Sequence, residues 1–246
     1  GAEAAPLIGA LRLAYRLGDA NLSVPLLAQA ARTANDAETF ALLAEIAAEA
    51  NDARGRLLIG KRALYAGHLL HAEAFPTEGV PPVDAAGAAV ERAMVLAIAR
   101  QESAFDPGAI SPAGARGLMQ LMPATARETA KRAGLAYDLN RLTADPAYNA
   151  TLGAAHLGEL VGYWRGSYIL TFAAYNAGPG NVRRWIAAYG DPRSPGVDPV
   201  DWVERIPFNE TRNYVQRVME NLQVYRERVD GRTALLIDED LRRGAN

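Results

Sequence analysis

Short amphipathic segments occupy residues 1–70 of this chain, and they constrain its fold more than any other feature of the sequence. Each carries apolar residues at helical spacing along one face; the segments are residues 6–17, 24–34, 37–50 and 53–67. An isolated helix of this length is marginal in water, so the apolar stripes must be buried against one another. Polar clusters between the segments supply the expected turns or N-caps, namely Asn21-Leu22-Ser23, Asn35-Asp36 and Asn51-Asp52. The sequence therefore predicts a helical appendage built from stacked short helices.

The composition favours a mainly α protein. Alanine, leucine and arginine dominate among 246 residues, aromatic residues make up only 7%, and runs of β-branched residues are scarce. The formal net charge is −2 without a basic stripe, which argues against a nucleic-acid partner. Cysteine is absent, which excludes disulfides, thiolate metal sites and cysteine nucleophiles. We expect no transmembrane segment, and a first residue of Gly without a signal-peptide pattern indicates a processed or recombinant start.

The character of the sequence changes over residues 68–89, which contain Pro81-Pro82 and a short alanine-rich stretch. Because two successive prolines favour an extended backbone, we assign residues 71–87 to a linker. His68 and His71 lie close by at i and i+3. With no carboxylate or third histidine at matching spacing, they do not predict a metal site.

A carboxylate ends an apolar helix directly after this linker. Residues 90–101 place Met94, Val95 and Ile98 at helical spacing, and Glu102 follows where the helix would leave a packed core. A carboxyl group half out of water resists ionisation, so we expect a pKa of Glu102 raised toward neutrality. A raised pKa is what a side chain needs to donate a proton at physiological pH. Glu102 is therefore the candidate general acid.

Further helices are expected downstream, and together they delimit one domain at residues 88–230. A loop rich in Gly, Ser and Pro spans residues 106–117, and a helix begins near Pro123. Asp145-Pro146 combines an N-cap with a proline for the first helical turn. The other helices are expected at residues 146–164, 167–175, 181–189 and 210–229, with a looser stretch at 191–200. Residues 231–246 follow as a C-terminal tail.

Four segments of this region carry distinctive motifs. They are Arg-Gln-Glu-Ser-Ala-Phe at 100–105, Ser-Pro-Ala-Gly-Ala-Arg-Gly-Leu-Met-Gln-Leu-Met-Pro-Ala-Thr-Ala at 111–126, Ala-Tyr-Asn-Ala-Gly-Pro-Gly-Asn-Val at 174–182 and Ile-Pro-Phe-Asn-Glu-Thr-Arg-Asn-Tyr-Val at 206–215. In this order they resemble the successive motifs of the lysozyme-like lytic transglycosylases of the soluble, Slt type. The resemblance implies a lysozyme-like SLT domain, preceded by helices that resemble the end of the family's α-superhelical domain.

The same resemblance implies cleavage of the β-1,4 bond between N-acetylmuramic acid and N-acetylglucosamine in peptidoglycan, with formation of a 1,6-anhydromuramic end. Glu102 would act first as acid on the glycosidic oxygen and then as base on the C6 hydroxyl, without a second carboxylate. Asp106 is close in sequence, but Asp-Pro is an ordinary turn start. The implied partner is the glycan strand, the implied compartment is the periplasm, and no cofactor is implied. A lysozyme-type hydrolase and a non-catalytic peptidoglycan-binding or assembly protein remain open alternatives.

Several residues of the second motif are candidates for substrate binding. Ser111 and Gln120 offer neutral hydrogen-bonding groups to a sugar, and Gly114 and Gly117 would allow it to approach the backbone closely. Met122 would line the apolar side of an N-acetyl pocket, although a Met at helical spacing also fits a plain core position.

The third and fourth motifs add further candidates for substrate binding. Tyr175 and Asn176 end an apolar helix, where the tyrosine hydroxyl would reach Glu102 or the bond being cleaved; a Tyr bonded to a backbone carbonyl is the alternative. By resemblance, Glu210 lies in the substrate groove, although it could instead favour the helix dipole or pair with a neighbouring arginine. Tyr214, one turn on, is expected to face the same groove.

Overall fold

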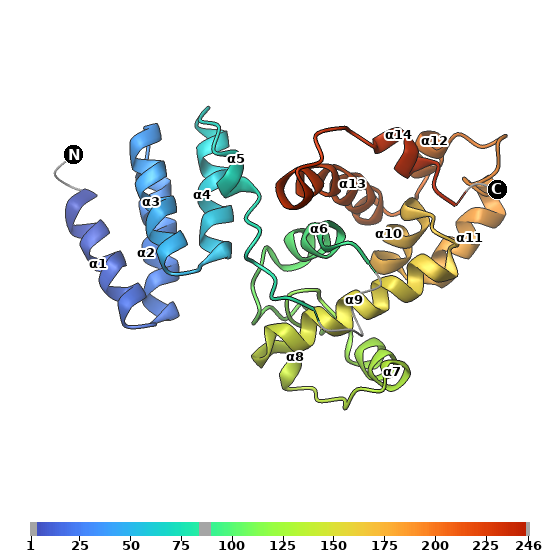
Figure 1. The fold of residues 1–246 in the computed structure, drawn as a ribbon, viewed down its shortest axis with the longest axis horizontal. Coiled ribbons are helices and arrows are strands. Elements are labelled where there is room, and N and C mark those ends of the chain that lie inside the picture. Colours follow the sequence, from blue (N-terminus) through green and yellow to red (C-terminus); the bar gives the residue numbers. More distant parts are fainter. Residues whose placement is uncertain (1–3, 84–89, 245–246) are drawn as a thin grey trace. The chain divides into compact units, whose positions relative to one another are not determined.

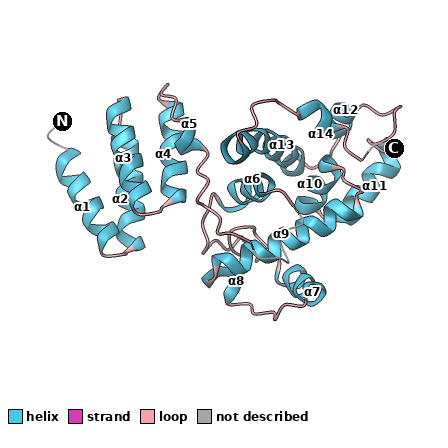
Figure 2. Ribbon diagram, viewed as in Figure 1, coloured by secondary structure: helices cyan, strands magenta, loops and turns pink. Residues whose placement is uncertain are grey.

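The computed structural model describes residues 4–83 and 90–244 and divides into two compact units, Gly1–Gly79 and Val80–Asn246 (Figure 1). Within the described residues every named element is a helix, and isolated bridges join Arg116 to Ile110 and to Leu121 (Figure 2). The prediction of a mainly α fold is confirmed. The boundary between the units falls inside the stretch assigned to a linker, while the expected start of the second domain at residue 88 lies outside the described residues.

The N-terminal unit is a stack of short helices. They are α1 (Ala4–Arg16), α2 (Ala20–Thr33), α3 (Ala37–Glu49), α4 (Ala53–Tyr65) and α5 (His71–Ala74). Their apolar stripes meet in one core, whose buried members include Leu11, Leu27, Phe40, Leu43 and Ile59. Burying one such side chain contributes about 1.5–3 kcal/mol, which is what stabilises helices too short to persist alone.

Aspartates cap three helices of this unit. Asp36 and Asp52 begin α3 and α4 by accepting a backbone N–H at 2.7 Å and 2.8 Å, as the sequence predicts. The prediction for α2 is wrong, because Asn21-Leu22-Ser23 lies inside the helix rather than before it. Asp19 supplies the cap there by accepting the Asn21 amide at 2.9 Å, so the helix begins earlier than expected.

A short helix occupies the first part of the predicted linker. α5 packs on α4, where a Cβ added to Gly60 would lie 2.4 Å from the backbone nitrogen of Ala74. Glycine at this position therefore permits the close approach of α5. Arg56 of α4 also pairs with Glu73 of α5 at 2.5 Å. This part of the linker is consequently a packed element and not an extended spacer.

The C-terminal unit surrounds one buried helix. Its elements are α6 (Arg92–Ser103), α7 (Pro123–Ala133), α8 (Arg141–Ala144), α9 (Pro146–Tyr163), α10 (Tyr168–Ala177), α11 (Pro179–Tyr189), α12 (Pro199–Glu204), α13 (Asn209–Asp230) and α14 (Ile237–Leu241). Residues 93–99 of α6 are all buried, which requires neighbours on every side, and α13 is its main partner (Figure 1). This packing sets the C-terminal end of α6 beside the start of α13.

Residues 231–244, part of the predicted tail, are held to the unit by a buried arginine. Arg226 of α13 bonds to Glu91 at 2.7 Å, next to the start of α6, and to Asp240 of α14 at 2.5 Å. Burial alone would lower the pKa of Arg226, but the two carboxylates raise it by more, so the guanidinium stays charged. Residues 231–244 are thus an integral part of the C-terminal unit.

Among the residues that the structure describes, no helix has both the length and the apolar character needed to cross a bilayer.

Candidate active site

Glu102 lies in the last turn of α6, at the point where the helix leaves the core. The chain turns sharply after it, because Ala104 and Phe105 both adopt left-handed backbone conformations, with φ of +52° and +64°. Such conformations are strained for residues with a Cβ and need support from their surroundings. The buried Phe105 side chain anchors the turn, which leaves the Glu102 side chain only partly accessible.

Burial raises the pKa of Glu102 to about 7. Desolvation of the carboxylate is the largest cause, a hydrogen bond from Tyr214 opposes it, and the negative charge of Glu210 adds to the rise. The negative end of the α6 dipole acts in the same direction as desolvation. At neutral pH a large share of the molecules therefore carries a protonated carboxyl group, the form that a general acid requires.

The two candidate tyrosines have different hydrogen-bond partners. The hydroxyl of Tyr214, a buried residue of α13, donates to Oε1 of Glu102 at 2.7 Å. The hydroxyl of Tyr175 donates instead to the backbone carbonyl of Met119 at 2.9 Å, which is the alternative that the sequence left open. The reason lies in packing, because α13 runs along α6 whereas α10 directs Tyr175 to the loop that follows α6. Burial raises the pKa of Tyr175, and the charge of nearby Glu102 raises it further.

Asn176 and Glu210 form a hydrogen-bonded pair between α10 and α13. The Asn176 Nδ2 donates to Glu210 at 3.2 Å, and its Oδ1 accepts the hydroxyl of Thr211 at 2.6 Å. Since Thr211 is buried, it determines which way the Asn176 amide faces. Glu210 itself is exposed, and the neighbouring Arg212 donates to backbone carbonyls at the end of α12. Thr211 is a residue that the sequence analysis does not single out.

Ser111 closes the loop that follows Glu102. Its Oγ accepts the amide of Ala115 at 3.0 Å, and its own amide donates to the Ala115 carbonyl at 2.9 Å. Gly114 takes a φ of +91° in this turn, and a Cβ there would meet no atom within 4 Å. The space beside Gly114 is compatible with the expected close approach of a substrate, while the Ser111 hydroxyl already serves the turn.

Gln120 and Met122 lie at the far end of the same loop. The Gln120 Nε2 donates to the carbonyls of Gly117 and Ala109 at 3.0 Å and 3.2 Å. Met122 is 43% exposed, so a plain core position is excluded for it. The expectation for Gly117 is wrong: a Cβ there would lie 2.1 Å from the carbonyl oxygen of Leu142, so its close contact is with the protein and not with a substrate.

Two polar side chains that the sequence analysis does not single out hold this loop in place. Asn149 of α9 is fully buried, accepts the amide of Met119 at 2.9 Å, and donates to two backbone carbonyls, each at 2.9 Å. Ser103, next to Glu102, donates to the carbonyl of Leu118 at 2.8 Å. The only signal for Asn149 in the sequence is one amide within an otherwise apolar helix face, which does not reveal its partners.

The remaining acidic candidates have structural roles. Asp106 accepts the Gly108 amide at 3.0 Å, as a turn-starting residue does. Asp145 caps α9 by accepting the Tyr148 amide at 3.0 Å, in agreement with the prediction. Over residues 4–83 and 90–244, no three His, Cys, Asp or Glu side chains are grouped so that they could hold a metal ion.

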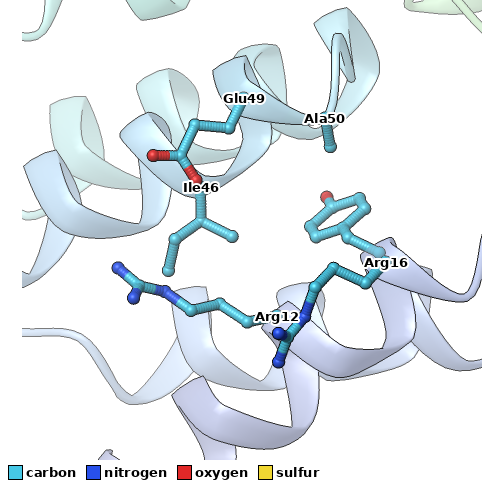
Figure 3. A pocket seen from close by; sticks show the side chains of 6 residues that line it. Arg12, Arg16, Ile46, Glu49 and Ala50 are labelled. Carbon is cyan, nitrogen blue, oxygen red and sulfur yellow. The ribbon is translucent and has the colours of Figure 1, made fainter.

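A cavity of about 490 Å³ lies in the N-terminal unit and contains none of the candidate residues (Figure 3). Its lining comprises Arg12, Tyr15, Arg16, Ile46, Glu49 and Ala50. Figure 3 shows the two arginines along α1 and Glu49 on the opposite helix. These three charged residues are exposed, and none of them is a candidate from the sequence. Chemistry, and not cavity size, therefore identifies the site.

A partly buried carboxyl group of raised pKa that accepts a hydrogen bond from a tyrosine is the arrangement that a general acid requires. Comparison with known families agrees with an enzymatic role. Residues 83–194 match the transglycosylase SLT domain, and residues 205–233 match the soluble lytic transglycosylase helical domain. Residues 83–194 and 205–233 thus resemble the soluble lytic transglycosylases.

Curated relatives share this part of the sequence. A putative soluble lytic murein transglycosylase of Haemophilus influenzae is 46% identical over 131 residues, which is 53% of this chain and 21% of that protein. The soluble lytic murein transglycosylase of Escherichia coli K12 is 42% identical over 142 residues, which is 57% of this chain and 21% of that protein. The chain thus aligns with about a fifth of the length of these relatives.

Solved structures extend the likeness to the N-terminal helices. An inactive Glu-to-Gln mutant of lytic transglycosylase Slt from Pseudomonas aeruginosa superposes with a TM-score of 0.72 at 30% identity, over 92% of this chain and 36% of that one. A complex of the 70-kDa soluble lytic transglycosylase with bulgecin A gives 0.73 at 29% identity, over 94% of this chain and 37% of that one. Such coverage includes most of the N-terminal unit, which supports its superhelix-like character.

Proposed function

We propose that this chain is a lytic transglycosylase that cleaves the β-1,4 bond between N-acetylmuramic acid and N-acetylglucosamine in peptidoglycan. The observation that carries the proposal is the partly buried Glu102, whose pKa of about 7 lets it exist in both protonation states at neutral pH. A group that acts as acid and then as base needs this property. The similarity to soluble lytic murein transglycosylases supports the substrate class.

The proposed reaction uses Glu102 twice. Tyr214 donates to Oε1, so the acidic proton resides on Oε2 and passes to the glycosidic oxygen as the bond to the muramic anomeric carbon breaks. The resulting carboxylate then removes the proton from the C6 hydroxyl of the same sugar, and O6 bonds to the anomeric carbon. No water is consumed, and Glu102 ends protonated as it began. The Tyr214 hydroxyl stabilises the carboxylate between the two steps.

Substrate binding is assigned to the groups around this carboxyl. Asn176 and Gln120 present amides, Met122 presents an exposed thioether, and Glu210 lies where it would contact sugar or peptide. The two amides and the thioether are neutral, which fits a substrate with acetamido and hydroxyl substituents. We place the reaction in the periplasm, where peptidoglycan is found, and assign the catalytic domain to residues 88–230.

Mass spectrometry of muropeptides released from purified sacculi tests the proposal. The wild-type chain is expected to release products with a 1,6-anhydromuramic end, and Glu102→Gln is expected to release none. Glu220→Gln is the matched control, because Glu220 is an exposed residue of α13 that pairs with Arg217 at the surface. Products heavier by one water would establish a hydrolase instead, and equal release by wild type and Glu102→Gln would refute the catalytic assignment.

A further inference from the structure

The backbone of Leu118 and Met119 is held by side chains from three different helices. Ser103 of α6 donates to the Leu118 carbonyl at 2.8 Å, and Tyr175 of α10 donates to the Met119 carbonyl at 2.9 Å. Asn149 of α9 accepts the Met119 amide at 2.9 Å. This stretch therefore links the end of α6, where Glu102 lies, with α9 and α10.

The backbone conformation around Leu118 and Met119 depends on these hydrogen bonds. Gly117 has a φ of +76°, and Gln120, which has a Cβ, has a φ of +47°. A non-glycine residue in the left-handed region persists only where the surrounding structure determines it. The loop would consequently relax if its external hydrogen bonds were lost.

Asn149 provides the largest part of the support. Its side chain donates to the carbonyls of Arg116 and Leu142 at 2.9 Å each, in addition to accepting the Met119 amide. The residue is fully buried, so water cannot replace these bonds without rearrangement. A Cβ on Gly117 would lie 2.3 Å from Nδ2 of Asn149, which shows how closely the loop is seated on this amide.

We infer that Asn149 is a positioning residue for the transglycosylase reaction, because it fixes the loop that carries Gln120 and leads to Met122 relative to Glu102. The inference rests on the proposed function. Asn149 itself touches neither substrate nor Glu102; it acts through the backbone of residues 116–119. Displacement of a substrate-contacting group by about 1 Å can lower the rate by roughly 10²-fold.

Two substitutions test the role of this amide. Asn149→Leu removes all three hydrogen bonds, and the rate of anhydro-muropeptide release per folded molecule is expected to fall roughly 10²-fold at limiting sacculi. Asn149→Asp keeps an acceptor for the Met119 amide but sets a carboxylate against two carbonyls. Protonation would restore one donor, so the activity of Asn149→Asp relative to wild type should rise as the pH is lowered, whereas that of Asn149→Leu should not.

A direct structural readout accompanies the kinetics. Hydrogen exchange at the Met119 amide is expected to accelerate in both Asn149 variants. The alkaline limb of the pH–rate profile, which reports Glu102, should keep its wild-type midpoint, because Asn149 does not contact that carboxyl.

Leu160→Ala is the control for a mere loss of stability. Leu160 is a buried residue of the same helix, eleven positions and roughly 16 Å further on, and its truncation destabilises α9 without touching the loop. It should keep wild-type activity per folded molecule. Wild-type rates for Asn149→Leu, or an equal loss for Leu160→Ala, would overturn the inference while leaving the proposed function intact. A wild-type chain that forms no anhydro product would instead refute the proposed function, and the inference with it.

Discussion

Replacing Glu102 by Gln should stabilise the C-terminal unit, and increasingly so as the pH rises. The folded state raises the pKa of Glu102 from an ordinary 4.5 to about 7, mainly by burying the carboxyl group. Between these values the folded state binds the proton more tightly than the unfolded state. Stability is therefore lost as the pH rises from 4.5 toward 7 and levels off above it. Glutamine is nearly the same size and carries no ionisable proton, so it avoids this loss.

The size of the effect follows from the same pKa change. At about pH 8 the Glu102 carboxyl group is ionised in both the folded and the unfolded state. Burying its charge then costs the wild type about 3 kcal/mol in free energy of unfolding. At about pH 5 the cost is only about 1 kcal/mol, because most folded molecules are still protonated there. The free energy of unfolding of Glu102→Gln relative to wild type should thus increase by about 2 kcal/mol between the two pH values.

Urea unfolding followed by tryptophan fluorescence is the appropriate assay. The three tryptophans of the chain, Trp164, Trp185 and Trp202, all belong to the C-terminal unit, so their signal reports that unit alone. Glu220→Gln, at an exposed position of α13, should show no such pH dependence. A stability difference between Glu102→Gln and wild type that is the same at both pH values would refute the burial argument for Glu102.

Three further outcomes are expected. Tyr214→Phe removes the donor that stabilises the Glu102 carboxylate, so the alkaline midpoint of the pH–rate profile should move upward and kcat should fall; an unchanged midpoint would contradict the hydrogen bond. Gly117→Ala introduces a Cβ into a buried contact at a φ of +76° and should lower the free energy of urea unfolding by more than about 1 kcal/mol. Asp240→Ala leaves Arg226 without one of its two carboxylate partners. This substitution should lower the free energy of urea unfolding by about 3 kcal/mol.

Local features of the structure were predictable where neighbours in the sequence determine them. Asp36, Asp52 and Asp145 cap helices as expected, because an N-cap acts on amides two or three residues away. α2 was the exception: the sequence analysis assigned its cap to Asn21-Leu22-Ser23, whereas Asp19 supplies it. Short helices such as α5 and α14 were missed because tertiary contacts, and not propensity, stabilise them.

The candidate site was predictable in composition but not in its pairings. The motifs single out Tyr175 and Tyr214 equally, yet Tyr214 reaches Glu102 and Tyr175 reaches a backbone carbonyl. Thr211 and Asn149 carry no distinctive sequence signal, since their importance comes from partners more than 25 positions away. No local pattern encodes a contact of that kind.

The sequence by itself determined the helical class, most helix boundaries and the presence of one carboxyl group at the end of an apolar helix, because periodicity and capping act over a few residues. The tertiary structure alone decided which tyrosine holds Glu102, how strongly burial raises its pKa, and how Asn149 secures the neighbouring loop. Those properties depend on desolvation and on hydrogen bonds between helices distant in the chain. These desolvation effects and hydrogen bonds form only when α6, α9, α10 and α13 pack together.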